Sequence, residues 1–277
     1  MSRDAPTDPR TLPRDAVRRA LDAQRAYERR RQTLLGKGAE RLTEPVGGLF
    51  ARAVPPALVR MGLRAADRAA GLTLPAEITS HDINDPDACE AAARRVQAWA
   101  VGTNAATGGA AGWFGAAGLT ADIPATIALA ARNVRATGAA WGFAADSEAE
   151  RAFRLMVLEL ASTHAEKTRR ETLGALDGMA RVLETPAGRM MVDKGGEWVT
   201  EKVIERVLRQ MGVSLGSRKA AQVVPVIGGA VAAVVNASFQ TDVSRAARYS
   251  YRLRWLMSRN LLPAPEPAAT TDTEAGA

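Results

Sequence analysis

The sequence is poor in the residues that most catalytic and metal-binding sites require. It contains two histidines, His81 and His164, and one cysteine, Cys89, among 277 residues. A single cysteine cannot form an intramolecular disulfide, so we expect a reducing compartment and a Cys89 side chain inside a helical core. His164 lacks the paired-histidine spacing of a zinc-protease helix. The sequence therefore predicts neither a metal site nor a cofactor.

Nucleotide-binding and nucleophile motifs are also missing. The glycines between residues 108 and 118 have neither the lysine-serine ending of a phosphate loop nor the glycine order of a dinucleotide site. The serines lack the setting of a nucleophile elbow. No residue set supports a catalytic assignment, so the sequence favours a non-enzymatic protein.

Aromatic residues make up only 5% of the chain, whereas 47% is hydrophobic and much of that is alanine. This composition favours closely packed helices over a sheet sandwich. We expect an all-α fold with one domain over residues 14–261, between a disordered lead at 1–13 and a disordered Pro/Ala/Thr tail at 262–277. The lead lacks the apolar core of a signal peptide, so the expected location is the cytoplasm.

Charge is missing from two long stretches, residues 96–121 and 220–241, both rich in glycine and alanine. Glycine costs about 1 kcal/mol relative to alanine inside a helix, so its repetition indicates close backbone contact. Gly228, Ala232 and Asn236 recur at four-residue spacing, which lets helices approach closely. We expect two Gly/Ala-rich helical segments that pack against each other through small residues.

The same stretches are long enough to enter a bilayer, since about 20 apolar residues cross its hydrocarbon core. Polar and helix-breaking residues such as Asn104, Pro225 and Asn236 distinguish them from ordinary transmembrane helices. A peripheral or hairpin-like insertion fits this composition better than a spanning helix.

Several helix boundaries can be predicted from capping residues. Asp122 with Pro124 predicts the start of a new helix, with the Asp122 carboxylate as its N-cap. Ser147 and Glu150 have the spacing of a capping box that opens a helix over residues 149–170. Asn84 or Asp85 caps the helix that begins at Pro86.

Further helices are expected at residues 14–35, 197–211 and 242–259, and short pieces within 41–74. Glycines and a proline interrupt residues 172–196, where we expect mobile connections instead.

The helix expected at 242–259 is strongly basic, with five arginines and no acid after Asp242. Together with the net charge of +7, it suits an anionic partner such as a phospholipid headgroup. Tyr249, Tyr251 and Trp255 would then sit at the headgroup boundary. The alternative is that the arginines solvate the helix while the aromatic residues complete the core. Nucleic acid ranks lower, because the basic residues are spread along the chain without a recognised binding fold.

The candidate contacts to an anionic membrane lipid or a membrane protein are the small and aromatic residues of the uncharged stretches and the residues of the basic helix. They are Gly108, Gly112, Trp113, Phe114, Gly115, Gly228, Gly229, Arg245, Arg248, Arg252 and Trp255.

Several of these features together resemble the EcsC family of bacterial proteins. The likeness rests on the glycine-rich run ending GLTADIP, the Trp141-Gly142-Phe143 turn, the segment ERAFRLMVLEL, and the distal KAAQVVPVIGGAVAAVVNASFQTDVSRAARYSYRLRWL, all within residues 96–256. The family is named after the third member of a gene cluster that encodes an ABC transporter, so the resemblance implies a link to membrane transport or secretion. It supplies no agreed reaction and no catalytic residues. Some members bear a staphylolytic-protease label, but this sequence has no metalloprotease motif.

Three functions remain open at this point. The first is a non-enzymatic accessory or lipid-interacting protein at the inner face of the membrane, with its glycine-rich hairpins facing lipid or a membrane partner. The second is a soluble helical interaction scaffold in which the same stretches are core. The third is an unrecognised hydrolase.

Overall fold

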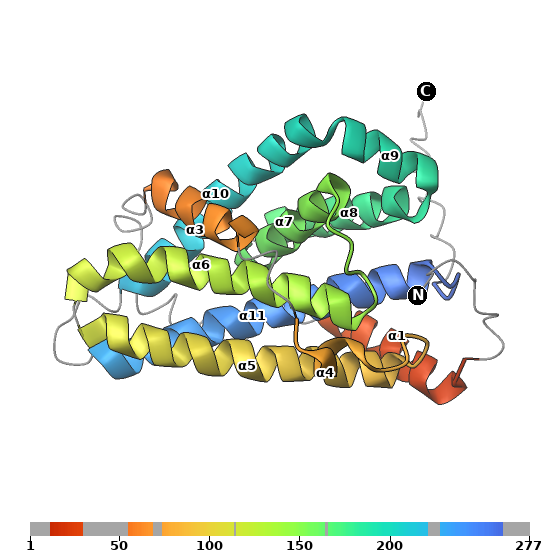
Figure 1. Ribbon diagram of the computed structural model, residues 1–277, viewed down its shortest axis with the longest axis horizontal. Coiled ribbons are helices and arrows are strands. Elements are labelled where there is room, and N and C mark those ends of the chain that lie inside the picture. The colour runs from red at the N-terminus through yellow and green to blue at the C-terminus, as the bar shows by residue number, and fades with distance from the viewer. Residues whose placement is uncertain are drawn as a thin grey trace, which may run out of the picture.

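The computed structural model describes residues 12–29, 55–68, 74–113, 115–163, 166–220 and 228–262 (Figure 1). Across these ranges it contains ten helices and no strand, which confirms the all-α prediction. The predicted lead and tail fall outside the described ranges apart from residues 12, 13 and 262, so their disorder stays a prediction.

Ten helices make up most of the described ranges. In chain order they are α1 (Arg14–Arg29), α3 (Pro56–Arg68), α4 (Ala76–Thr79), α5 (Pro86–Trp113), α6 (Gly115–Ala140), α7 (Glu148–Ser162), α8 (Glu166–Glu184), α9 (Pro186–Lys194), α10 (Gly196–Ala220) and α11 (Gly228–Met257).

Residues 172–196 are mostly helical, so the prediction of mobile connections there is wrong. The buried residues Leu176, Ala180 and Leu183 recur at helical spacing in α8, and their burial outweighs the cost of the glycines on its exposed side. Thr185 then caps α9, because its Oγ1 accepts a hydrogen bond from the Gly188 amide at 3.0 Å.

Helix α11 is central to the arrangement. It packs along α5 and α6, which form an antiparallel pair, and it also contacts α1, α7 and α8 (Figure 1). On the other side of α6, α3 packs against it, and α10 packs against α7. Because α11 has neighbours on most of its sides, the polar residues that it carries must find partners inside the protein.

A line of buried amide and hydroxyl groups joins α11 to the α5–α6 pair. Asn104 Nδ2 donates to the Asn236 carbonyl at 2.9 Å, which links α5 to α11. Asn133 of α6 donates to Gln240 Oε1 at 3.2 Å and to Ser244 Oγ at 2.8 Å. All five of these residues are buried. The hydrogen bonds fix the register of α11 against both helices, since a shift along the axis would leave buried amides unpaired.

Asp122 belongs to the same polar contact, and the prediction that it is an N-cap is wrong. Helix α6 begins seven residues earlier and continues through Pro124. The buried Asp122 carboxylate instead accepts a hydrogen bond from Asn236 Nδ2 at 3.2 Å. Proline inside a helix costs about 3 kcal/mol, so tertiary packing of α6 outweighs the local preference for a break.

Ser147 is the N-cap of α7, as its sequence position predicts, and its Oγ accepts from the Glu150 amide at 3.3 Å. The Glu150 side chain does not complete a capping box. Its two oxygens accept from Nη1 and Nη2 of Arg254 on α11, both at 2.8 Å. Both side chains are buried, and the Arg254 guanidinium lies 4.2 Å from the centre of the Phe143 ring.

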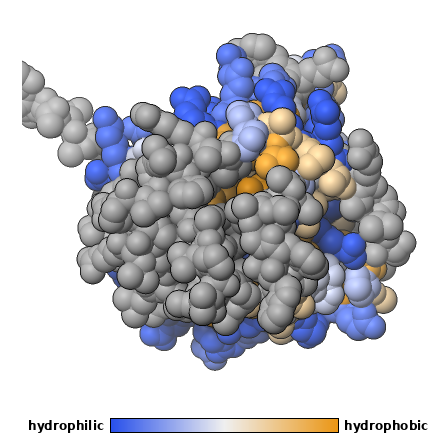
Figure 2. Space-filling view, turned by 90° about the vertical axis from the view of Figure 1, so that its left-hand side faces the viewer, coloured by the Kyte–Doolittle hydropathy of each residue, from blue (hydrophilic) through white to orange (hydrophobic). Residues whose placement is uncertain are grey.

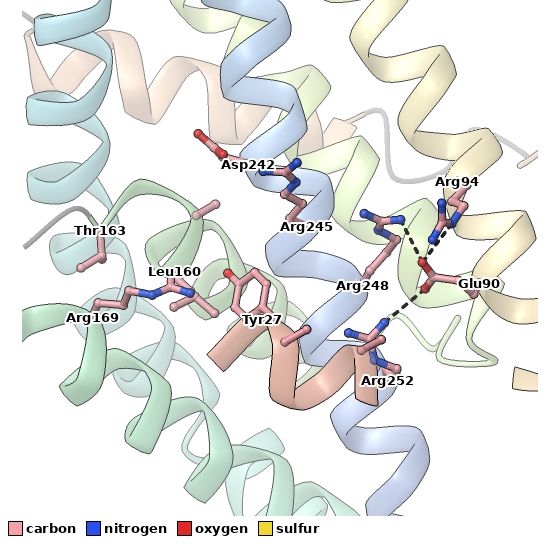
Figure 3. Close-up of a pocket in the computed structure, with 13 residues that line it drawn as sticks. Tyr27, Glu90, Arg94, Leu160, Thr163, Arg169, Asp242, Arg245, Arg248 and Arg252 are labelled. Atoms are coloured by element: carbon pink, nitrogen blue, oxygen red, sulfur yellow. Dashed lines mark hydrogen bonds and ion pairs between the residues drawn. The ribbon is translucent and has the colours of Figure 1, made fainter. Parts of the chain in front are cut away.

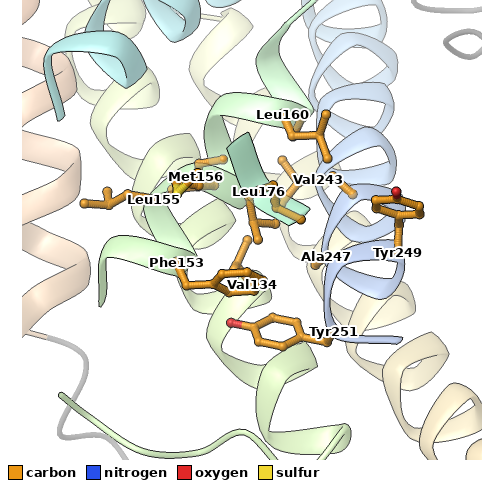
Figure 4. Packing of buried hydrophobic residues seen from close by; sticks show 14 of the residues in the cluster. Val134, Phe153, Leu155, Met156, Leu160, Leu176, Val243, Ala247, Tyr249 and Tyr251 are labelled. Atoms are coloured by element: carbon orange, nitrogen blue, oxygen red, sulfur yellow. The ribbon is translucent and has the colours of Figure 1, made fainter. Parts of the chain in front are cut away.

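The apolar core fills the space between α6, α7, α8 and α11 (Figure 4). Val134, Phe153 and Tyr251 meet in it, with the Phe153 and Tyr251 rings edge to face at 5.5 Å. The Tyr251 ring lies directly on Gly138 of α6, where a Cβ atom would come within 2.6 Å of the Tyr251 Cζ atom. Gly138 therefore lets α6 and α11 approach closely enough for the ring to fit.

No helix in the described part of the chain is both long and apolar enough to cross a membrane. Figure 2 shows the end of the molecule at which α5 gives way to α6. There, among the residues with a described placement, apolar side chains gather in one strip between hydrophilic ones.

Replacing Gly138 with alanine should destabilise the protein by about 1–3 kcal/mol, because the added methyl group overlaps the Tyr251 ring. The measurement is urea unfolding followed by circular dichroism. Gly178→Ala on α8 is the control: its Cβ would meet nothing within 4 Å, so it should be neutral or stabilising by up to about 1 kcal/mol. Equal stability of the two variants would contradict the close contact.

Glu150→Gln should cost about 3–5 kcal/mol of unfolding free energy, because it removes the carboxylate paired with the buried Arg254 guanidinium and leaves only Glu184, 3.9 Å away. The same denaturation series provides the measurement. Glu148→Gln, two residues earlier at a half-exposed position, is the control and should change stability by less than about 1 kcal/mol. A loss at Glu150 no larger than at Glu148 would show that the buried pair is dispensable.

Candidate anion-binding site

A basic pocket opens between α1, α5, α8 and α11, next to the end of α7 (Figure 3). Its volume is about 220 Å³. Five arginines and two carboxylates line it, an excess of three positive charges: Arg94, Arg169, Arg245, Arg248, Arg252, Glu90 and Asp242. Such an excess in a partly enclosed space raises the local concentration of anions.

Three of these arginines come from α11. Arg245, Arg248 and Arg252 follow one another at intervals of three and four residues, which places them on one face of a helix. Figure 3 shows that this face borders the pocket. Arg245 is exposed, whereas the side chains of Arg248 and Arg252 are only 14% and 6% exposed.

Glu90 of α5 is the acceptor for three guanidinium groups. Its Oε1 accepts from Arg248 Nη1 at 2.9 Å and from Arg94 Nε at 3.2 Å, and its Oε2 accepts from Arg252 Nη1 at 3.3 Å. Arg252 also donates through Nε to Gln24 of α1 at 3.2 Å. We call Glu90, Arg94, Arg248 and Arg252 the Glu90 cluster.

Burial lowers the pKa of both Arg248 and Arg252, and Glu90 opposes this effect. Neighbouring arginines lower these two pKa values further, because each guanidinium group repels the others. Both side chains nevertheless stay charged at neutral pH, since arginine begins from a very high pKa. The cluster is therefore a concentration of positive charge that one carboxylate only partly offsets.

The facing wall of the pocket is aromatic and cationic. Tyr27 of α1 stacks on Tyr249 with ring centroids 4.4 Å apart, and the Arg169 guanidinium of α8 lies 4.8 Å from the Tyr27 ring centre. Burial raises the pKa of both tyrosines, so both phenols are neutral. Tyr249 uses its hydroxyl to donate to Glu28 at 3.2 Å.

The structure places the predicted contact residues in different environments. Arg245, Arg248 and Arg252 come together in the pocket. The headgroup-boundary role of Trp255 is wrong, because its side chain is fully buried and its Nε1 donates to the Ile83 carbonyl at 2.7 Å. Tyr249 and Tyr251 are also buried, since α11 is covered by other helices where these aromatic residues point. The alternative prediction, in which the aromatic residues complete the core, is confirmed for these three side chains.

The remaining predicted contacts cannot be placed at the level of side chains. Residues 96–113 of the first uncharged stretch belong to α5, and its residues from 115 onward belong to α6. Helix α11 begins at residue 228, within the second uncharged stretch. The following candidates lie outside the residues whose side chains are described: Gly108, Gly112, Trp113, Phe114, Gly115, Gly228 and Gly229.

Among the charged and aromatic residues that line the pocket, five were not predicted as site residues: Tyr27, Glu90, Arg94, Arg169 and Asp242. The four arginines of α11 do indicate that carboxylates must face them if the helix is buried. Nothing local identifies the partner, because Glu90 is 158 residues away from Arg248.

The described residues hold no cluster of three histidine, cysteine or acidic side chains that could bind a metal ion. Cys89 is fully buried, as predicted, and burial raises its pKa to about 12, which excludes a role as a nucleophile at neutral pH. His81 uses its Nε2 in a 2.8 Å contact with the Ala140 carbonyl, and His164 lies outside the described residues.

The fold and the pocket define an all-α protein with a central polar helix and a partly enclosed basic site. The chain belongs to the EcsC protein family, whose sequence model matches residues 23–256. The match extends well upstream of residue 96 and includes every residue that lines the pocket, from Ala23 to Arg252. No curated protein and no solved structure matches the chain.

Cys89 should resist thiol reagents in the folded protein, because its raised pKa keeps the thiol protonated at pH 8. We expect modification by a disulfide reagent to be at least roughly a hundredfold slower in buffer than in 6 M guanidinium chloride, where the pKa returns to about 8.5. The release of the coloured thiol product measures the rate. Complete modification of the native protein at the denatured rate would contradict the burial of Cys89.

Proposed function

We propose that this EcsC family protein is a non-enzymatic, peripheral membrane protein that binds the phosphate-bearing headgroup of an anionic lipid in its basic pocket. The observation that carries the proposal is the convergence of Arg94, Arg248 and Arg252 on the single carboxylate of Glu90. A surplus of buried positive charge is costly unless an anion offsets it.

The chemistry of the pocket suits phosphate in particular. Guanidinium groups are planar and present several N–H donors, so they bind phosphate oxygens in pairs. The pocket volume of about 220 Å³ is below the range usual for drug-sized ligands, and it matches a headgroup better than a whole lipid. Under this proposal the acyl chains remain outside the pocket.

Other features support a position at a bilayer surface. Trp99 of α5 is 48% exposed and lies under the Arg132 guanidinium of α6, at 5.1 Å from its ring centre. An exposed tryptophan beside a cation is typical of side chains at a membrane interface. Each cation near an anionic surface adds about 1 kcal/mol of attraction, and the chain carries an excess of seven.

In this proposal the glycine- and alanine-rich hairpin between α5 and α6 faces lipid. Because the described helices lack a membrane-spanning one, the attachment is peripheral. The resemblance to proteins associated with an ABC transporter fits an accessory role in membrane transport or secretion.

A helical interaction scaffold is the second candidate. Met190 and Met191 of α9 are adjacent and exposed by 57% and 65%, and flexible methionine pairs are frequent on surfaces that bind other proteins. A scaffold of this kind would not bind vesicles of any composition, so one experiment separates the two candidates.

The test is flotation with vesicles of neutral lipid alone and of neutral lipid mixed with an anionic phospholipid. We expect binding only to the anionic vesicles. The double variant Arg245→Gln/Arg248→Gln should lose about 2 kcal/mol of binding free energy, roughly thirtyfold in affinity, because two pocket cations are removed.

The double variant Lys194→Gln/Lys202→Gln has the same net charge and is the matched control, since both lysines are exposed and lie on α9 and α10 outside the pocket. It should retain most of the binding. Failure of the wild type to float with anionic vesicles would refute the proposal. An equal loss in both double variants would assign binding to general surface charge rather than to the pocket.

A further inference from the structure

The Glu90 cluster has a defined charge balance. Three guanidinium groups surround one carboxylate, so two positive charges stay uncompensated within the cluster. Elsewhere in the lining, Arg169 of α8 and Arg245 of α11 accompany one further carboxylate, that of Asp242 of α11. The surplus is therefore concentrated around Glu90, where α5 and α11 meet (Figure 3).

We propose that the pocket selects a doubly charged phosphomonoester group over a singly charged phosphodiester group. The inference rests on the proposed function and adds the chemical class of the ligand. A phosphomonoester carries a charge of about −1.5 to −2 at pH 7 and presents three terminal oxygens. It offsets the two surplus charges, whereas a phosphodiester offsets only one of them.

Because the cluster is largely buried, the difference of one charge between a phosphomonoester and a phosphodiester should have a large effect on binding. Arg248 and Arg252 are mostly buried, so solvent and salt screen their charges much less than those of surface arginines. The repulsion among the arginines of the cluster also contributes to the lowered pKa of Arg248. An anion that removes this repulsion completely gains more than one that removes half of it.

The donors available in the cluster also favour a group with three oxygens. Nε of Arg248 and Nε2 of Gln24 are buried and have no hydrogen-bond acceptor in the described part of the protein. Gln24 lies against Arg252, through the bond from Arg252 Nε to Gln24 Oε1. Arg94 is 69% exposed and uses Nε for Glu90, so its terminal nitrogens are accessible from the pocket mouth. Three arginines on two helices thus present donors from several directions.

The experiment changes the net charge of the Glu90 cluster one unit at a time, in the full-length protein. Glu90→Gln leaves three surplus charges, the wild type two, and Arg94→Gln one. Each variant is titrated at pH 7.5 with vesicles that contain phosphatidic acid, a phosphomonoester, or phosphatidylglycerol, a phosphodiester. Glu205→Gln and Lys202→Gln on α10 change the net charge equally but lie outside the pocket.

The wild type should bind phosphatidic acid vesicles at least tenfold more tightly than phosphatidylglycerol vesicles. This preference should increase severalfold in Glu90→Gln and decrease severalfold in Arg94→Gln, while both α10 variants keep the wild-type ratio. Soluble glycerol 3-phosphate is added as a competitor, with dimethyl phosphate as its singly charged counterpart. Competition by glycerol 3-phosphate alone supports the phosphomonoester class and identifies a free phosphate compound, rather than the lipid, as a sufficient ligand.

Equal binding of the two vesicle types by the wild type overturns the inference. A preference for phosphatidic acid that does not rise with the positive charge of the Glu90 cluster overturns it as well. Anionic binding would then still be present and the proposed function would stand. Absence of binding to both vesicle types refutes the proposed function itself. If Glu90→Gln fails to fold, as shown by circular dichroism, the exposed Arg94 position still decides, because an unchanged preference in Arg94→Gln is sufficient to overturn the inference.

Discussion

The fold depends on one constraint: the central helix α11 carries many polar side chains from Asn236 onward, and most of them are buried. Each buried polar group on it must meet a partner from another helix, because an unpaired one costs several kcal/mol. Near its middle Asn236, Gln240 and Ser244 are paired with α5 and α6. In its second half the arginines are paired with acids of α5 and α7. The positions of α5, α6 and α7 around α11 are thus set by polar contacts as well as by the apolar core.

Such contacts favour one arrangement more strongly than alanine packing does. Small apolar side chains fit many registers, so a bundle of alanine-rich helices has several near-equivalent ways to pack. A register shift in this protein would separate Asn133 from Ser244 and Glu150 from Arg254, leaving amides and charges buried without partners. The polar residues of α11 therefore contribute specificity of packing, which we state as a hypothesis for this protein.

The sequence was a good guide to helices and a poor one to their partners. The Ser147 cap and the helix start at Pro86 follow from local chemistry, because the Ser147 and Asp85 side chains bond amides two or three residues away. Asp122 has the same local pattern and yet lies inside α6, since its partner Asn236 is 114 residues further along the chain. The pocket could be predicted only in part for the same reason. The arginine spacing on α11 indicates a basic face, but the opposing Glu90 is brought there by packing alone.

The arginines of α11 also show how one constraint produces both structure and a site. Arg254 has two carboxylates close by: Glu150 forms a paired contact at 2.8 Å, and Glu184 lies 3.9 Å away. Burial raises the pKa of Glu184, and the positive charge of Arg254 opposes this effect. Around Glu90 the ratio is reversed, with three arginines to one acid. If the carboxylates served only to neutralise the arginines of α11, we would expect a similar ratio of arginines to carboxylates around Arg254 and around Glu90. The imbalance at the pocket end, where α11 also borders an open cavity, is the observation that supports the proposal of an anion-binding site there.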